Sequence, residues 1–117
     1  KMAIVNKVEK RVKVNKDSVI RFQIITHCFM NNILISASDL NCLTELAKQK
    51  SIDLTNFCTK ISEQLIFKSP QSCRNAIQKA KRKLLVIKDG KKVMLNPLMK
   101  IQTTGDIYLD FKILGVD

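Results

Sequence analysis

The sequence predicts a single domain of the α+β class, mainly helical with a small β component. Its 117 residues are the size of one compact domain, and its 45% apolar residues are enough to form a buried core. Three consecutive segments carry apolar residues at helical spacing, and an Asp-Gly turn between two short apolar runs then indicates a β-hairpin. We therefore expect an N-terminal extension over 2–35, a core over 36–97 and a C-terminal extension over 98–117, all within one compact domain.

The N-terminal extension begins with a predicted strand. Three valines, Val8, Val12 and Val14, are interleaved with basic residues there. A turn-prone segment follows at 15–18. Residues 19–32 fit two patterns. Strand-like alternation is shown by Ile20, Phe22 and Ile24. Alternatively, Ser18 can cap a helix that ends near residue 32, and the length of the segment favours this helix.

The first two core helices are predicted over 36–50 and 53–65. Ser36, followed three residues later by Asp39, resembles a capping box. Four apolar residues then share one helical face: Leu40, Leu43, Leu46 and Ala47. Asp53 can cap the second helix, and its apolar stripe comprises Leu54, Phe57, Cys58, Ile61 and Leu65. Such a stripe is typical of a helix that faces the core, so both predicted helices should pack there.

A third core helix is predicted over 70–83. Ser69 offers an N-cap, and Pro70 suits the first helical position because proline lacks the N–H that a helix leaves unpaired there. The predicted buried stripe comprises Cys73, Ala76, Ile77, Ala80 and Leu84. The opposite side of this helix should therefore face outward.

Short strands are predicted after the third helix. An apolar run at 84–87 and a second run at 93–95 are separated by Asp89 and Gly90, a pair that favours the tight turn of a hairpin. Alternating apolar and polar residues over 107–113 predict one more strand in the C-terminal extension. The β component therefore follows the helices in the chain.

The composition does not favour an enzyme. One His, ten carboxylates and three Gly leave few residues for hydrolytic dyads, multi-His metal sites or Gly-rich phosphate loops. His27 and Cys28 are adjacent, and neighbouring side chains diverge on both helix and strand, so they do not form a nucleophile and base. We therefore expect no catalytic residue, no metal, no cofactor and no small-molecule substrate.

The four cysteines are expected to be reduced core residues. Cys28, Cys42, Cys58 and Cys73 are widely spaced in the chain, without the C-x-x-C pair that begins many zinc sites. Disulfides remain the alternative for a secreted chain.

The longest uncharged run, residues 22–38, is too short and too polar to span a bilayer. We expect a soluble protein without a membrane partner, in the cytoplasm of a bacterium, or in the host cytoplasm or virion if a phage encodes it.

The outward side of the predicted third helix carries amides and a guanidinium. At 100° per residue, the side chains opposite the buried stripe are Gln71, Asn75, Gln78 and Arg82. In the major groove Asn and Gln pair with adenine, and Arg pairs with guanine, through two hydrogen bonds each. We predict that these four residues face DNA bases. The alternative is an ordinary solvated helix surface.

Positive charge is concentrated in the same part of the chain. The net charge is +11, and between residues 68 and 100 ten basic residues accompany one acid, Asp89. Clustering of this kind is typical of a surface that binds phosphates. The residues predicted to face DNA phosphates are Lys68, Ser69, Ser72, Arg74, Lys79, Lys81, Lys83, Lys88, Lys91 and Lys92.

Residues 36–97 resemble the winged helix-turn-helix DNA-binding domains of small bacterial, plasmid and phage regulators and replication initiators. The likeness lies in the order of helix, turn, helix and basic hairpin, and in three segments: Ser69-Pro70-Gln71-Ser72, Lys83-Leu84-Leu85-Val86 and Asn96-Pro97. The chain departs from the pattern at Phe57-Cys58, where a small Ala is common, and it lacks the Gly common before the wing.

This resemblance implies a three-helix core with a basic hairpin as the wing. It also implies binding of double-stranded DNA through a recognition helix at about 70–83 and a wing at about 84–96, in transcription or replication control. The alternative is a structural or adaptor role in a phage or other nucleoprotein assembly, where the basic face binds nucleic acid nonspecifically or an acidic protein. A homodimer or a larger assembly is compatible with either role.

Overall fold

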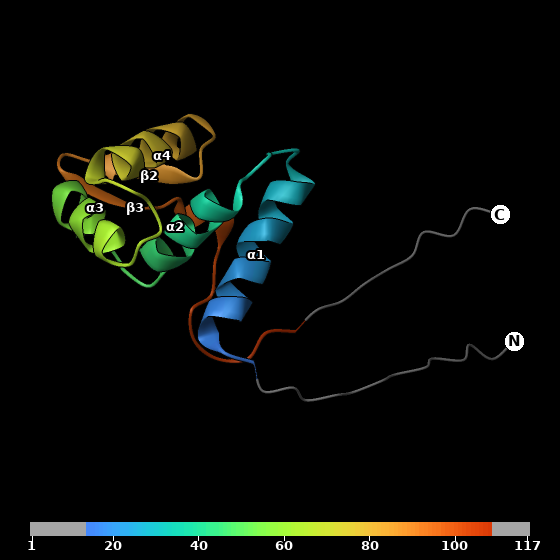
Figure 1. Cartoon of the computed structure of the whole chain (residues 1–117). Helices are drawn as coiled ribbons and strands as arrows, with labels where there is room; N and C mark the ends of the chain where they lie inside the picture. The colour runs from blue at the N-terminus through green and yellow to red at the C-terminus, as the bar shows by residue number, and fades with distance from the viewer. Residues whose placement is uncertain (1–13, 109–117) are drawn as a thin grey trace, which may run out of the picture.

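The computed structural model describes residues 14–108 and has an α+β fold, as predicted (Figure 1). The described part holds four α-helices, a small three-stranded antiparallel sheet and one short 3-10 helix. The elements are, in chain order, α1 Lys16–Met30, α2 Ala37–Ala47, β1 Ile52–Asp53, α3 Leu54–Glu63, α4 Pro70–Arg82, β2 Val86–Asp89, β3 Lys92–Leu95 and η1 Pro97–Met99.

The helices begin where polar side chains can bind their first free N–H groups. The predicted caps of α2, α3 and α4 are confirmed: they are Ser36, Asp53 and Ser69. The side chain of each accepts a hydrogen bond from the backbone N–H three residues later. In α1 the cap is Asn15, whose Oδ1 accepts from the N–H of Ser18 at 2.8 Å. The alternative cap at Ser18 is therefore wrong, and the helix begins at Lys16.

The helical interpretation of residues 19–32 is confirmed, and the strand interpretation is wrong. Ile20, Ile24 and Cys28 are buried against α2, whereas Phe22 is 44% exposed. This four-residue spacing is that of one helix face. Lys48 further joins the two helices, because its Nζ lies 2.6 Å from a carboxylate oxygen of Asp17. Hydrogen bonding to Asp17 raises the pKa of Lys48.

The prediction that Leu65 and Leu84 are buried in the core is wrong. They are 88% and 72% exposed, and both have positive φ angles, 59° and 63°. The reason is that α3 ends at Glu63 and α4 ends at Arg82. After α4, the N–H of Leu84 binds the carbonyl of Lys81 at 3.0 Å, and the N–H of Leu85 binds that of Ala80 at 2.9 Å. This pair of bonds is a Schellman motif, which turns the chain and buries Leu85 in place of Leu84.

The sheet has the order β1-β3-β2. The predicted hairpin is confirmed: Asp89 pairs with Lys92, and the two-residue loop between them starts with Gly90 at φ 59°. The strand β2 begins at Val86, two residues later than predicted, because the Schellman motif occupies the preceding residues. The strand β1 was not predicted. Its two residues pair with β3, and Ile52 lies opposite Val93.

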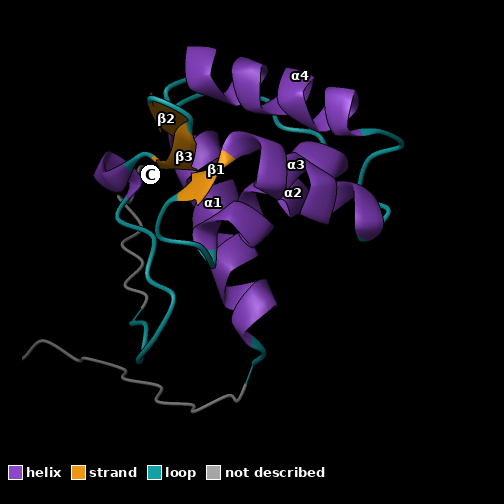
Figure 2. Cartoon of the chain, turned by 90° about the vertical axis from the view of Figure 1, so that its left-hand side faces the viewer, coloured by secondary structure: helices purple, strands orange, loops and turns teal. Residues whose placement is uncertain are grey.

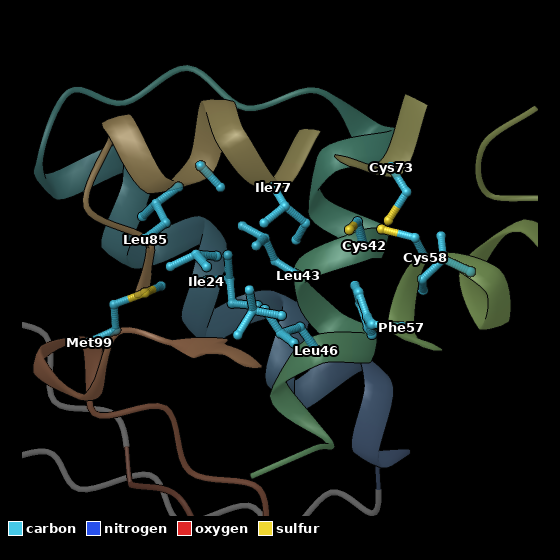
Figure 3. Close-up of a cluster of buried hydrophobic side chains, with 14 of the residues drawn as sticks. Ile24, Cys42, Leu43, Leu46, Phe57, Cys58, Cys73, Ile77, Leu85 and Met99 are labelled. Carbon is cyan, nitrogen blue, oxygen red and sulfur yellow. The ribbon is translucent and has the colours of Figure 1, made fainter. Parts of the chain in front are cut away.

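The core lies between α1, α2, α3, α4 and the sheet (Figure 3). Phe57 and Ile61 are completely buried, so the predicted inward face of α3 is confirmed. All four cysteines are free and buried, also as predicted. The other fully or nearly fully buried large side chains include Leu43, Leu46, Leu85, Val86 and Val93.

The terminal strands predicted in the extensions fall largely outside the described residues. Of the N-terminal strand only Val14 is described, and it is exposed and lies in no strand. Of the strand predicted over 107–113 only Ile107 and Tyr108 are described, and they also lie in no strand. Residues 101–108 return beside α1. There Gln23 donates a hydrogen bond to the backbone carbonyl of Gln102 at 2.7 Å and accepts one from its backbone N–H at 2.8 Å.

None of the helices within residues 14–108 combines the length and apolar character of a membrane span.

Candidate nucleic-acid interface

The predicted base-facing residues form an exposed row on α4. Figure 2 shows α4 along the upper edge of the domain, with its outer side facing away from the other elements. The inner side is buried on the core through Cys73, Ala76, Ile77 and Ala80. The outer side presents, all exposed, Gln71, Asn75, Gln78 and Arg82. The sequence prediction of which side faces outward is therefore confirmed.

Two amides of this row contact each other. The Nε2 of Gln71 donates a hydrogen bond to Oδ1 of Asn75 at 3.0 Å, across one turn of the helix. The bond does not use the Nδ2 donors of Asn75 or the Oε1 acceptor of Gln71, so these groups can bind another molecule. An adjacent donor and acceptor are what the edge of an adenine requires. The pair can therefore act as a unit toward a base, with its amide orientations set before contact.

The first turn of α3 connects α4 to the hairpin. Arg74 donates a hydrogen bond from Nη2 to Oγ1 of Thr55 at 3.0 Å. The next residue back, Leu54, donates its backbone N–H to the carbonyl of Lys91 at 2.8 Å, in the loop of the hairpin. These contacts fix the hairpin loop relative to the first half of α4. Sequence reasoning missed Thr55, because nothing local in the sequence signals a contact with a side chain of another helix.

Three lysines at the hairpin are exposed: Lys88, Lys91 and Lys92. The basic residues at the end of α4, Lys81 and Arg82, are exposed as well, as is Lys68 ahead of its first turn. Within residues 14–108 none of these six side chains forms an ion pair. Their charge is therefore uncompensated by the described acids, as a surface that attracts phosphates requires.

Two other lysines with predicted phosphate contacts are held by the protein itself. Lys79 forms an ion pair with Asp39 of α2, with 2.6 Å between Nζ and Oδ2. Lys83 donates to the backbone carbonyl of Leu34 at 2.8 Å. Both side chains join α4 to the segment around the start of α2. The charge available on this side is therefore centred on the hairpin and on Lys81 and Arg82.

The two predicted serines act at the start of α4. Ser69 accepts the N–H of Ser72 through its Oγ at 3.2 Å, and the two hydroxyls lie 3.1 Å apart. Their oxygens are partly committed to capping the helix. The exposed N-terminal turn above them still carries the positive end of the α4 dipole, which favours a phosphate.

The buried cysteines form no comparable site. Figure 3 shows Cys42, Cys58 and Cys73 with their sulfurs close together inside the core. Burial, and then the Cys73 thiol, raises the pKa of Cys58 to about 12. The contact with Cys42, followed by burial, also raises the pKa of Cys73. The thiols of Cys58 and Cys73 are therefore protonated and weakly nucleophilic at neutral pH. Among the described residues, no group of three His, Cys, Asp or Glu side chains could hold a metal ion.

The exposed row of α4 and the basic hairpin are thus the main chemically distinctive surface of residues 14–108. A search of protein-family models, of curated proteins and of solved structures finds no match to the chain.

Proposed function

We propose that this chain is a winged helix-turn-helix protein that binds double-stranded DNA and controls transcription or replication. The observation that carries the proposal is the exposed row of amides and a guanidinium on α4, beside a hairpin whose three lysines form no ion pair with the acids of residues 14–108. In this proposal α4 enters the major groove, and the hairpin lies on the neighbouring phosphate backbone.

The order of elements supports this proposal. From α2 to β3 the chain runs helix, strand, helix, helix, strand, strand, and β1 pairs with the second strand of the hairpin in the order β1-β3-β2. This is the arrangement expected of a winged helix, in which α3 and α4 form the helix-turn-helix and β2 and β3 form the wing. Four residues, 65–68, lie between the C-cap of α3, Gln64, and the N-cap of α4, Ser69. The turn of a helix-turn-helix has about three or four residues.

The wing in this proposal is short and held close to the domain. Only two residues, Gly90 and Lys91, lie between its strands, and the Lys91 carbonyl binds the first residue of α3. A short, fixed wing presents its lysines at one place and does not reach far along a groove. It therefore suits contact with phosphates, which hold the protein in position, and α4 would supply the sequence readout.

Fluorescence anisotropy with a labelled random duplex tests the proposal. We expect binding that weakens steeply between about 50 mM and about 200 mM salt, because bound lysines release counterions. The double variant Lys91→Ala/Lys92→Ala should lower the log–log salt slope by about 0.9 per lost phosphate contact. The matched control, Lys16→Ala/Lys50→Ala, removes the same charge from exposed sites outside α4 and the hairpin, and should change the slope less.

Two results would contradict the proposal. The first is the absence of duplex binding at low salt, which would favour the adaptor role and an acidic protein as the partner. The second is an equal effect of the two double variants, which would mean that only the net charge of +11 attracts DNA.

A further inference from the structure

The first helix has a second apolar side, opposite the one that packs on α2. Ile20, Ile24 and Cys28 are buried on the core. The other side carries Phe22, Ile25 and Phe29, which are 44%, 46% and 81% exposed. Their spacing of three and four residues places them along one line of the helix. We refer to Phe22, Ile25 and Phe29 as the α1 stripe.

The α1 stripe is exposed in the part of the chain that the structure describes. The returning segment 101–108 lies beside α1, but it is attached through Gln23, which lies on nearly the opposite side of the helix from Ile25. An aromatic side chain buries roughly 150–250 Å² when it is fully covered. Most of this area is still accessible on Phe29 and a little under half on Phe22, and such adjacent apolar surface is typical of an interaction site. The stripe therefore has the character of an interface.

Charge indicates what kind of partner fits. The chain carries a net charge of +11, yet residues 22–38 contain no charged side chain. Two copies of so basic a chain repel each other at most surfaces. Contact through the α1 stripe keeps the basic hairpins apart. Arg21 borders the stripe, and its guanidinium binds Asn41 of α2. An acidic partner, by contrast, would find no countercharge on this segment.

The spacing of the stripe is also self-complementary. In a symmetric dimer each surface must match itself under a twofold rotation. If two α1 helices cross antiparallel at a point between Ile25 and Thr26, Phe22 lies opposite the partner's Phe29. Both phenylalanines are then covered by a phenylalanine, and Ile25 lies at the centre.

From these observations we infer that the α1 stripe is a homodimer interface between antiparallel α1 helices. The inference is independent of DNA binding, because the α1 stripe shares no residue with α4 or the hairpin. Figure 1 shows α1 on the other side of α2 from α4. A dimer formed through α1 would leave both α4 faces uncovered. The contact is small, so we expect a reversible dimer whose fraction rises with concentration.

Sedimentation velocity across the micromolar range tests the inference. The wild type should change from monomer to dimer as its concentration rises, in a buffer without nucleic acid. Phe29→Glu should remain monomeric over the same range, because a dimer would bury two carboxylates without partners. The control is Leu98→Glu, since Leu98 is also 81% exposed but belongs to η1. Circular dichroism should show equal helix content in all three proteins.

Cysteine cross-linking tests the antiparallel arrangement. The four native cysteines are buried, so a new surface thiol can be followed separately. A mixture of Phe22→Cys and Phe29→Cys chains should form a disulfide between the two variants. Either variant alone should not, because its two thiols would lie about 10 Å apart along the helices, beyond disulfide reach.

Any of three results would overturn the inference. A wild-type chain that stays monomeric would show that another part of the chain or another molecule covers the stripe. A dimer that survives Phe29→Glu would place the interface elsewhere. Disulfides formed within each variant alone, and not in the mixture, would exclude the antiparallel register.

Discussion

Lys79 of α4 and Asp39 of α2 form an ion pair, with 2.6 Å between Nζ and Oδ2. The Asp39 side chain is only 13% exposed, whereas that of Lys79 is 50% exposed. The backbone N–H of Asp39 also binds the hydroxyl of the α2 cap, Ser36, at 3.1 Å. The start of α2 therefore holds one lysine of the proposed DNA-binding surface and neutralises it.

Asp39→Asn should release Lys79 and strengthen binding to random duplex DNA. An additional phosphate contact would raise the magnitude of the log–log salt slope by about 0.9. Loss of the pair and of an acid in the first turn of α2 should cost no more than about 1–2 kcal/mol of stability. Anisotropy titrations at several salt concentrations measure the slope. An unchanged slope would mean that Lys79 does not reach a phosphate.

Asn75→Ala should relax sequence preference and leave nonspecific affinity nearly unchanged, because Asn75 carries no charge. A lost bidentate contact costs roughly 1–3 kcal/mol of discrimination at one base pair. Selection from randomised duplexes should give a defined motif for the wild type and a relaxed one for the variant. Thr104→Ala, an exposed and uncharged change outside α4 and the hairpin, is the control. If the wild type selects no motif, α4 does not read bases.

Leu84→Gly should stabilise the fold by about 0.5–1 kcal/mol, because a residue with a Cβ is strained in the left-handed conformation and glycine is not. Leu84 occupies the left-handed position of the Schellman motif with a φ of 63° and is 72% exposed. Urea unfolding measures the difference. Leu98→Gly is the control, since Leu98 is similarly exposed but has no positive φ, and it should not stabilise. A destabilised Leu84→Gly would show that the side chain contributes more than the strain costs.

Alkaline pH should destabilise the protein through its buried thiols. The pKa of Cys58 is about 12 in the folded chain, and an unfolded cysteine has a pKa near 8.5. Stability is therefore unaffected by this group below about pH 8, and falls as the pH rises from about 9 toward 12. One such thiol costs about 1.4 kcal/mol per pH unit within that window.

Unfolding measured from pH 7 to pH 10 in a reducing buffer tests this dependence, and Cys58→Ala should have a shallower decline. The buried thiols should also react with iodoacetamide only as fast as the chain opens. Fast labelling of the native chain at neutral pH, or an identical decline in Cys58→Ala, would contradict the assignment.

The sequence was informative where structure depends on neighbouring residues. The caps Ser36, Asp53 and Ser69 each bind a backbone N–H of the first turn that follows, and the hairpin turn at Gly90 is equally local, so local patterns located them. The stripe of α4 also follows from helical periodicity alone. For the same reason, the outward side of α4 could be assigned before the fold was known.

Features that depend on distant residues were missed. The strand β1 is very short and exists because β3, which follows it only after α3, α4 and β2, pairs with it. The pair between Lys79 and Asp39 likewise joins separate helices. Helical periodicity predicts a buried Leu84 because the apolar spacing continues in the sequence past the end of α4, and no glycine marks the left-handed turn.

Chemical-shift mapping by 15N-edited NMR with a short duplex tests the central proposal most directly. Backbone amides over 71–82 and 88–92 should shift as duplex is added, and those of α1 and η1 should remain in place. The side-chain amides of Gln71 and Asn75 should shift as well, because in this proposal the hydrogen-bonded pair contacts a base. Shifts confined to the α1 stripe, or none at a salt concentration that permits phosphate binding, would contradict the proposal that α4 and the hairpin bind DNA.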